Sequence, residues 1–222
     1  MSGVHSAVVK NSNGQSLLQV LPSPLPYLSG SAVVSTLSTL YGAEKSSTAQ
    51  LSQTGVIALL PPLLSANTFN VEAQDYLTAL TLSANAAANA LACGSVLAGQ
   101  TSETDEFGDL ALWLGEGHYG KGHEREVLEA LGLHGALGPQ IKITPVDIPA
   151  AMHLPSNLTE LVARSSEGKR LSSLLSQLDH IYSFTVQPMP AGGGSVAQFL
   201  LGHRSHEGFS GWSGLVGIGV WS

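Results

Sequence analysis

The chain has 222 residues, 43% of them hydrophobic, so it is long enough to bury a sizeable core in one large or two small domains. Only 11% of the residues are charged, which is less than half the usual share, and they leave a net charge of −7. This composition excludes a charged, disordered chain, and the negative charge argues against nonspecific nucleic-acid binding, which needs a basic face. A basic partner protein is compatible with the charge.

The N-terminal part predicts a β-hairpin followed by a helix. Apolar runs at residues 7–9 and 17–21 flank an Asn-Gly pair, which supplies positive φ at little cost. Residues 31–41 then predict a helix with its apolar side turned inward. Together, residues 3–20 and this helix resemble the opening of roadblock-type domains. The resemblance implies a scaffold or adaptor subunit of a GTPase-regulating complex.

A long helix is predicted over residues 71–97. Its apolar face is formed by leucines and alanines at helical spacing, whereas Thr81, Asn85 and Asn89 form a polar stripe at i, i+4 and i+8. We interpret the stripe as an edge that contacts solvent or another helix, with a ligand site as the alternative.

Cys93 is the only cysteine, so the chain has no internal disulfide framework and no Cys-rich zinc site. It lies in an alanine- and leucine-rich run, which indicates a buried, structural thiol rather than a nucleophile. A lone thiol suits a reducing compartment, and the N-terminus shows no apolar stretch followed by a cleavage site. We therefore expect a cytoplasmic protein. The apolar runs are too short or too interrupted to predict a membrane span.

Residues 101–117 are rich in Asp and Glu and predict a loop that runs into a short helix, a candidate for contact with a basic surface. His118 and His123 follow, crowded beside carboxylates ahead of a helix predicted over residues 124–133. A zinc-binding His-Glu-x-x-His helix needs a second histidine one turn after His123, and Val127 stands there instead. We therefore predict neither a metal nor another cofactor. A hydrolase that uses His118 and His123 remains an alternative.

The region from residue 141 to the end predicts a sheet with a helix packed on it. Leucines recur at helical spacing over residues 171–181, and a glycine-bearing loop is predicted over residues 202–214, too long for a two-residue turn. Strands are predicted at residues 141–148, 184–187, 196–201 and 215–221. We expect an α/β (α+β) protein whose C-terminal strands are mostly antiparallel. The expected division is an N-terminal hairpin and helix over residues 1–70, within the same domain or beside it, and a helical segment with an α/β core over residues 71–222.

The order of these elements resembles the core of the nuclease A inhibitor-like family over residues 141–222. The matching features are Val146-Asp147-Ile148 at a strand end, the spacing of Leu174, Leu175 and Leu178, the apolar strand ending at Gly202, and the last strand from Gly214. The resemblance implies a non-catalytic inhibitor that fills a basic nuclease cleft with acidic and aromatic side chains. The residues that we expect to contact the partner are Glu207, Phe209, Trp212, Trp221 and Ser222. A core position is the alternative for Trp212 and Trp221.

Common catalytic motifs are missing from the sequence, which has no Gly-x-Ser-x-Gly elbow and no dinucleotide fingerprint. His203 and His206 with Glu207 offer an acid–base cluster, which we interpret as part of a solvent-exposed loop. The leading hypothesis is a non-catalytic protein whose partner is another protein, a nuclease by the resemblance, with no direct contact to nucleic acid. A roadblock-like scaffold and an unrecognised hydrolase are the alternatives.

Overall fold

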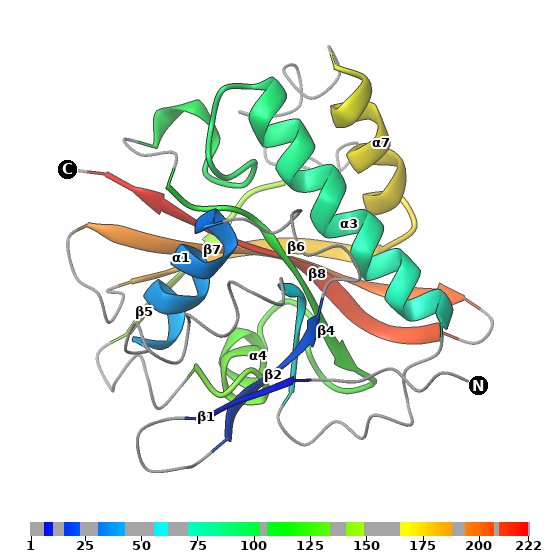
Figure 1. The fold of residues 1–222 in the computed structure, drawn as a ribbon. Helices are drawn as coiled ribbons and strands as arrows, with labels where there is room; N and C mark the ends of the chain where they lie inside the picture. The colour runs from blue at the N-terminus through cyan, green and yellow to red at the C-terminus, as the bar shows by residue number, and fades with distance from the viewer. Residues whose placement is uncertain are drawn as a thin grey trace.

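The computed structural model describes residues 7–10, 16–22, 31–42, 56–61, 71–102, 106–133, 141–148, 165–187, 194–206 and 209–221. Within them the chain forms an eight-stranded mixed sheet with helices packed on both faces (Figure 1). The predicted α+β class is confirmed. No helix in this part of the chain is both long and apolar enough to cross a membrane.

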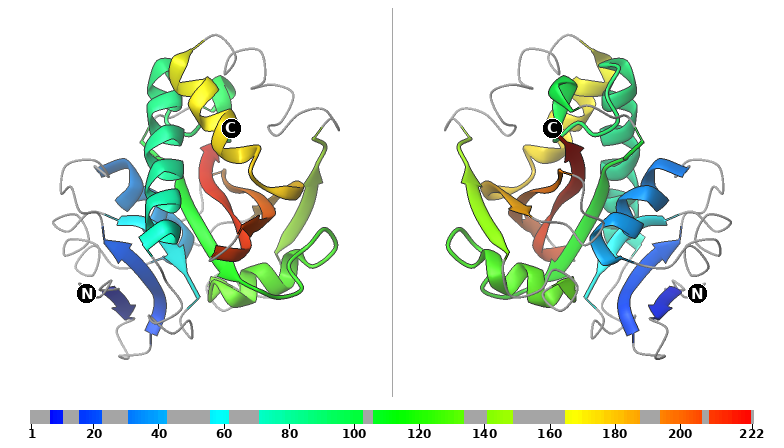
Figure 2. Two further views of the ribbon diagram at one scale, coloured as in Figure 1. Left: turned by 90° about the vertical axis from the view of Figure 1, so that its right-hand side faces the viewer. Right: turned by 90° about the vertical axis from the view of Figure 1, so that its left-hand side faces the viewer.

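The strands follow the spatial order β1-β2-β3-β4-β8-β7-β6-β5, so β1 and β5 lie at opposite ends of the sheet (Figure 2). They are β1 Ala7–Lys10, β2 Ser16–Pro22, β3 Val56–Leu60, β4 Leu110–Gly115, β5 Lys142–Val146, β6 Asp179–Gln187, β7 Ser195–His206 and β8 Phe209–Val220. The helices are α1 Ser31–Tyr41, α3 Val71–Ala90, α4 Glu124–Ala130 and α7 Ser166–Leu175, with a 3-10 turn at Gly99–Thr101.

Only the β3–β4 pair is parallel among the described strand pairs, and α3 makes the crossover between these two strands. The C-terminal strands β5 to β8 pair antiparallel, as predicted. The predicted N-terminal hairpin is confirmed as β1 and β2, and the following helix as α1. The division at residue 70 stays a prediction, and β3 pairs with β4 across it.

Strand β4 lies at the centre of the fold and is covered on both faces. Leu110, Leu112 and Leu114 point into the cluster formed with α1 and α4, whereas Ala111 and Trp113 point into the cluster formed with α3 and α7. Because both faces are dry, the strand is a continuous apolar run rather than an alternating one. The prediction of a loop and short helix over residues 101–117 was therefore wrong.

The polar stripe of α3 contacts this strand. The hydroxyl of Thr81 accepts a hydrogen bond from the backbone N–H of Ala111 at 2.8 Å. The side chain of Asn85 donates to the backbone carbonyl of Asp109 at 2.8 Å and accepts from its N–H at 3.2 Å. Asn89, one turn further along the helix, is exposed. The stripe is thus a structural contact between helix and sheet over its first two members.

Asp109 holds the turn that follows α3. Its carboxylate accepts hydrogen bonds from the hydroxyl of Ser95 at 2.7 Å and from the N–H of Val96 at 2.5 Å. The side chain is fully buried. Burial raises the pKa of Asp109 to about 6, against an ordinary value of 3.8, while the bonds from Ser95 and the backbone oppose this shift.

Two helices end earlier than predicted. α3 ends at Ala90 rather than at residue 97, and Ala92 adopts a left-handed φ of 51°. α7 ends at Leu175, and β6 begins at Asp179. Leu178 is nevertheless buried in the same cluster as the leucines of α7, so apolar spacing continued past the last helical turn.

The predicted loop over residues 202–214 was also wrong. β7 and β8 pair without interruption up to His206 and Phe209, which leaves only two residues for the connection. Gly202, Gly211 and Gly214, three of the glycines that suggested a loop, are positions of close approach to neighbouring strands. At Gly214, for example, a Cβ atom would collide with the backbone carbonyl of Leu200.

The raised pKa of Asp109 predicts a pH dependence of stability. Between the unfolded and folded pKa values the folded protein binds the proton more tightly, so the free energy of unfolding falls as the pH rises. We expect the protein to lose about 3 kcal/mol of unfolding free energy relative to Asp109→Asn between about pH 4 and pH 7. Chemical denaturation of both proteins across this range measures the difference. A difference that does not change with pH would contradict the prediction.

Candidate functional site

The aromatic residues predicted to contact a partner are packed inside the protein. Phe209 is 4% exposed and stacks on Trp113 with ring centroids 4.1 Å apart. Trp212 is 9% exposed, and its indole N–H donates to the carbonyl of Gly117 at 3.0 Å. The expectation that these two side chains lie on an exposed loop was wrong, because they are on β8, inside the sheet. A partner contact through them remains untested.

Three other residues were predicted to contact a partner: Trp221, Glu207 and Ser222. Trp221 is partly buried, and its backbone N–H donates to the carbonyl of Gly194 at 3.3 Å. Glu207 and Ser222 lie outside the described residues.

The segment that follows β4, residues 116–120, is hydrogen-bonded to the sheet. Besides the bond from Trp212 to Gly117, the hydroxyl of Tyr182 donates to the carbonyl of Tyr119 at 2.5 Å. A Cβ atom at Gly120 would touch the indole of Trp212 at 3.3 Å, so this segment lies close over the ring. The two anchored carbonyls bring Glu116 to the end of β7 and β8.

Glu116, His203 and Ser205 form a hydrogen-bonded series at that end of the sheet. The carboxylate of Glu116 lies 3.2 Å from Nε2 of His203, and Nδ1 of His203 lies 3.0 Å from the hydroxyl of Ser205. Ser210, the cross-strand neighbour of Ser205, donates to the other carboxylate oxygen of Glu116 at 2.5 Å. With the proton on Nε2, the imidazole donates to Glu116 and accepts from Ser205 at Nδ1.

This series can hold and move a proton. Hydrogen bonds from Ser210 and from His203 lower the pKa of Glu116, which keeps the carboxylate ionised beside the imidazole. The edge of the Trp212 ring system packs against the His203 ring at 5.5 Å and fixes its orientation. Sequence analysis singled out His203 but grouped it with His206 and Glu207, because the partner Glu116 is distant in sequence.

A second polar feature is an acidic groove between α4 and β5, with a volume of about 550 Å³. Its lining comprises Gly122, Glu124, Arg125, Glu126, Glu129, Ile143 and Pro145. Glu124 accepts a hydrogen bond from the N–H of Gly122 at 2.9 Å. The imidazole of His123 lies 3.1 Å from the carboxylate of Glu126 and lowers its pKa. The groove therefore presents three carboxylates and one guanidinium, that of Arg125, beside the apolar side chains of Ile143 and Pro145.

The histidine pair considered for metal binding lies beside this groove. The rings of His118 and His123 are 6.3 Å apart, and His123 is engaged with Glu126 on its own helix. Within the described residues no three His, Cys, Asp or Glu side chains are grouped so that they could hold a metal ion. The buried thiol of Cys93 has its pKa raised to about 11 by burial and by the charge of Asp109, so it is a poor nucleophile.

Arg204 is a buried cation that sequence analysis did not single out. Its guanidinium lies 4.4 Å above the ring of Tyr76 and 4.9 Å from that of Phe209. It donates to the side chain of Gln177 at 3.2 Å and lies 3.6 Å from the carboxylate of Glu72. These contacts join the end of β7 to α3 and to the turn after α7. The residue is therefore a structural cross-link.

Removal of this cross-link gives a stability prediction. We expect Arg204→Ala to lower the free energy of unfolding by about 2–4 kcal/mol, because it removes a buried side chain that packs on two aromatic rings and leaves space beside them. His206→Ala is the matched control. His206 also pairs with Glu72 at 3.0 Å, but its side chain is 58% exposed, so the loss should stay below about 1 kcal/mol. Equal losses in the two variants by urea denaturation would contradict the assignment.

Comparison with known proteins gives no functional assignment for the chain. No family model matches the chain. No curated protein and no solved structure matches it either. The resemblances to nuclease inhibitors and to roadblock-type domains therefore stay predictions.

Proposed function

We propose that the chain is a non-catalytic protein that binds a basic partner protein through the acidic groove between α4 and β5. The groove itself is the observation that carries this proposal. Three glutamates, at positions 124, 126 and 129, outnumber the single cation Arg125 in one depression that Ile143 and Pro145 also line. Lysine and arginine side chains have charged ends on aliphatic stems. The glutamates suit the charged ends, and Ile143 and Pro145 suit the stems.

Electrostatics supports the same partner class. The net charge of −7 steers a basic protein toward the molecule and repels nucleic acid. The hydrogen bond from His123 lowers the pKa of Glu126 further below neutral pH. The groove has a volume of about 550 Å³, which is enough for several side chains.

The position of the groove at the end of the sheet adds a mode of contact. β5 is the outermost strand on that side of the described sheet. An extended segment of a partner can pair with an edge strand while its side chains enter the neighbouring groove. Pro145 lacks a backbone N–H, which limits how many hydrogen bonds this edge can offer. A basic segment would thus gain specificity mostly from the groove.

The partner that we propose is a nuclease with a basic active-site cleft, in keeping with the resemblance of residues 141–222, and the setting is the cytoplasm. Phe209 and Trp212 are buried, so the contact is assigned to the groove instead of to an aromatic loop. The scaffold role that the N-terminal resemblance implies remains a prediction without a supporting contact.

Charge reversal tests the groove. The double variant Glu126→Lys/Glu129→Lys should weaken binding to an inhibited nuclease by about 10- to 100-fold, because favourable charge contacts become repulsive. Asp75→Lys is the matched control for the single variant Glu126→Lys, since both reverse one charge and Asp75 is exposed on α3, away from the groove. Binding is measured by calorimetry, and inhibition by DNA cleavage, across a panel of purified nucleases at low and high salt. Lack of inhibition across the panel refutes the nuclease role, and equal binding by both variants refutes the groove.

A second candidate function, ester hydrolysis, is favoured by one observation, the series Ser205–His203–Glu116. In this reaction the hydroxyl of Ser205 attacks an ester carbonyl and passes its proton to Nδ1 of His203, while Glu116 stabilises the imidazolium through Nε2. The proton then goes to the leaving alcohol, and water releases the acid from Ser205.

Serine-directed labelling tests this candidate. A fluorophosphonate probe should attach to Ser205, as mass spectrometry of the peptides would show, and Ser205→Ala should abolish the label. His203→Ala should slow labelling by about 100-fold or more, because the general base is lost. Ser173→Ala, at an exposed position of α7, serves as the control. A wild-type protein that stays unlabelled would eliminate hydrolysis and leave the series as a cross-link between strands.

A further inference from the structure

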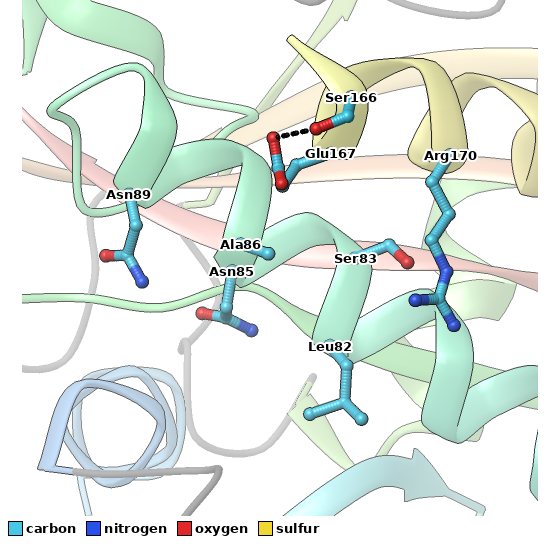
Figure 3. Close-up of a pocket in the computed structure, with 8 residues that line it drawn as sticks. All are labelled: Leu82, Ser83, Asn85, Ala86, Asn89, Ser166, Glu167 and Arg170. Atoms are coloured by element: carbon cyan, nitrogen blue, oxygen red, sulfur yellow. Dashed lines mark hydrogen bonds between the residues drawn. The ribbon is translucent and has the colours of Figure 1, made fainter.

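A separate groove lies between the helices α3 and α7, which run side by side on one face of the sheet (Figure 1). Its volume is about 510 Å³, within the range of small-molecule sites. One wall is formed by α3, with Leu82, Ser83, Ala86 and Asn89, and the other by the first turns of α7 (Figure 3). The groove is thus distinct from the acidic groove at β5.

Ser83 is the described residue of this groove that most clearly lacks a hydrogen-bond partner. The residue is 3% exposed, and among the described residues its hydroxyl has no hydrogen-bond partner. Figure 3 shows the hydroxyl directed toward the side chain of Arg170. Buried hydroxyls in proteins are almost always hydrogen-bonded, so an unpaired one that lines a groove indicates a missing partner.

The facing helix provides both signs of charge. Glu167 and Arg170 are three residues apart on α7, so their side chains leave the same side of the helix. The backbone N–H of Glu167 itself, and then the hydroxyl of Ser166, which donates to the carboxylate at 2.8 Å, lower the pKa of Glu167. Within the described residues no carboxylate lies within ion-pairing distance of Arg170.

Three kinds of contact are therefore available in one groove. Arg170 offers a cation to a carboxylate, and Glu167 offers an anion to an ammonium group. The hydroxyl of Ser83 and the exposed carboxamide of Asn89 offer hydrogen bonds to a polar side chain. Leu82 and Ala86 add apolar surface for a short aliphatic stem.

We propose that this groove binds a free α-amino acid with a polar side chain, held by Arg170 at its carboxylate, Glu167 at its ammonium group and Ser83 at its side chain. An α-amino acid carries its two charges on one carbon, and the adjacent turns of α7 carry the two complementary charges. This site is independent of the protein contact proposed at β5.

Calorimetric titration of the full chain with L-glutamine tests the site. Two analogues separate the charges: glutaramate lacks the ammonium group, and 4-aminobutanamide lacks the carboxylate. We expect saturable binding of L-glutamine, and binding at least about ten-fold weaker for each analogue. Arg170→Gln and Glu167→Gln should each weaken the binding of L-glutamine to a similar extent.

Ser83→Ala provides a readout that does not depend on the ligand. If the hydroxyl is unpaired in the free protein, this variant should melt at the same temperature as the wild type or higher, yet bind L-glutamine less tightly. Lys169→Gln and Ser173→Ala are exposed neighbours on α7 outside the groove and should change neither property. No saturable binding up to about 10 mM, equal binding of glutaramate, or a lower melting temperature for Ser83→Ala would each overturn the proposal.

Discussion

The burial of β4 on both faces is the constraint on which the rest of the structure depends. A strand without access to water needs helices on both sides and a partner for every polar group nearby. α3 provides Thr81 and Asn85 above the strand, and α1 provides Thr36, whose hydroxyl donates to the carbonyl of Gly108 at 2.6 Å. Asp109 turns the chain into the strand while it binds the turn after α3. The titration of Asp109 therefore reports on the integrity of this junction.

The burial of β4 also determines where groups that bind partners or exchange protons can lie. The middle of the sheet is filled by two apolar clusters, so groups that can meet a partner or exchange a proton lie at its ends and on the outer helices. Glu116 and His203 meet beyond the last residues of β4, and the acidic groove lies where β5 ends the sheet. Within the described residues Arg204 and Asp109 are the charged side chains buried inside the protein. Arg204 lies beside Glu72 and two aromatic rings, and Asp109 accepts hydrogen bonds from Ser95 and Val96, so both have structural roles.

The sequence predictions were wrong where one residue pattern occurs in two different kinds of structure. Glycines mark loops, but they also mark strands that cross closely, as at Gly214, so β7 and β8 were predicted too short. An apolar run that follows acidic residues resembles a loop leading into a helix, and β4 was missed for this reason. Aromatic residues anchor interfaces and also fill cores, and Phe209 and Trp212 belong to the core. None of these choices is decided by neighbours in the sequence.

By itself the sequence determined the α+β class, the N-terminal hairpin, the helices α1 and α4, and the antiparallel pairing of the C-terminal strands, since local periodicity and turn residues act over a few residues. Only the tertiary structure decided which polar residues meet. Glu116 and His203 are joined by a fold that brings β4 beside β8 and β8 beside β7. Ser83 likewise lies near α7 only because the fold packs α7 beside α3. Burial and long-range contact depend on packing, which no local pattern encodes.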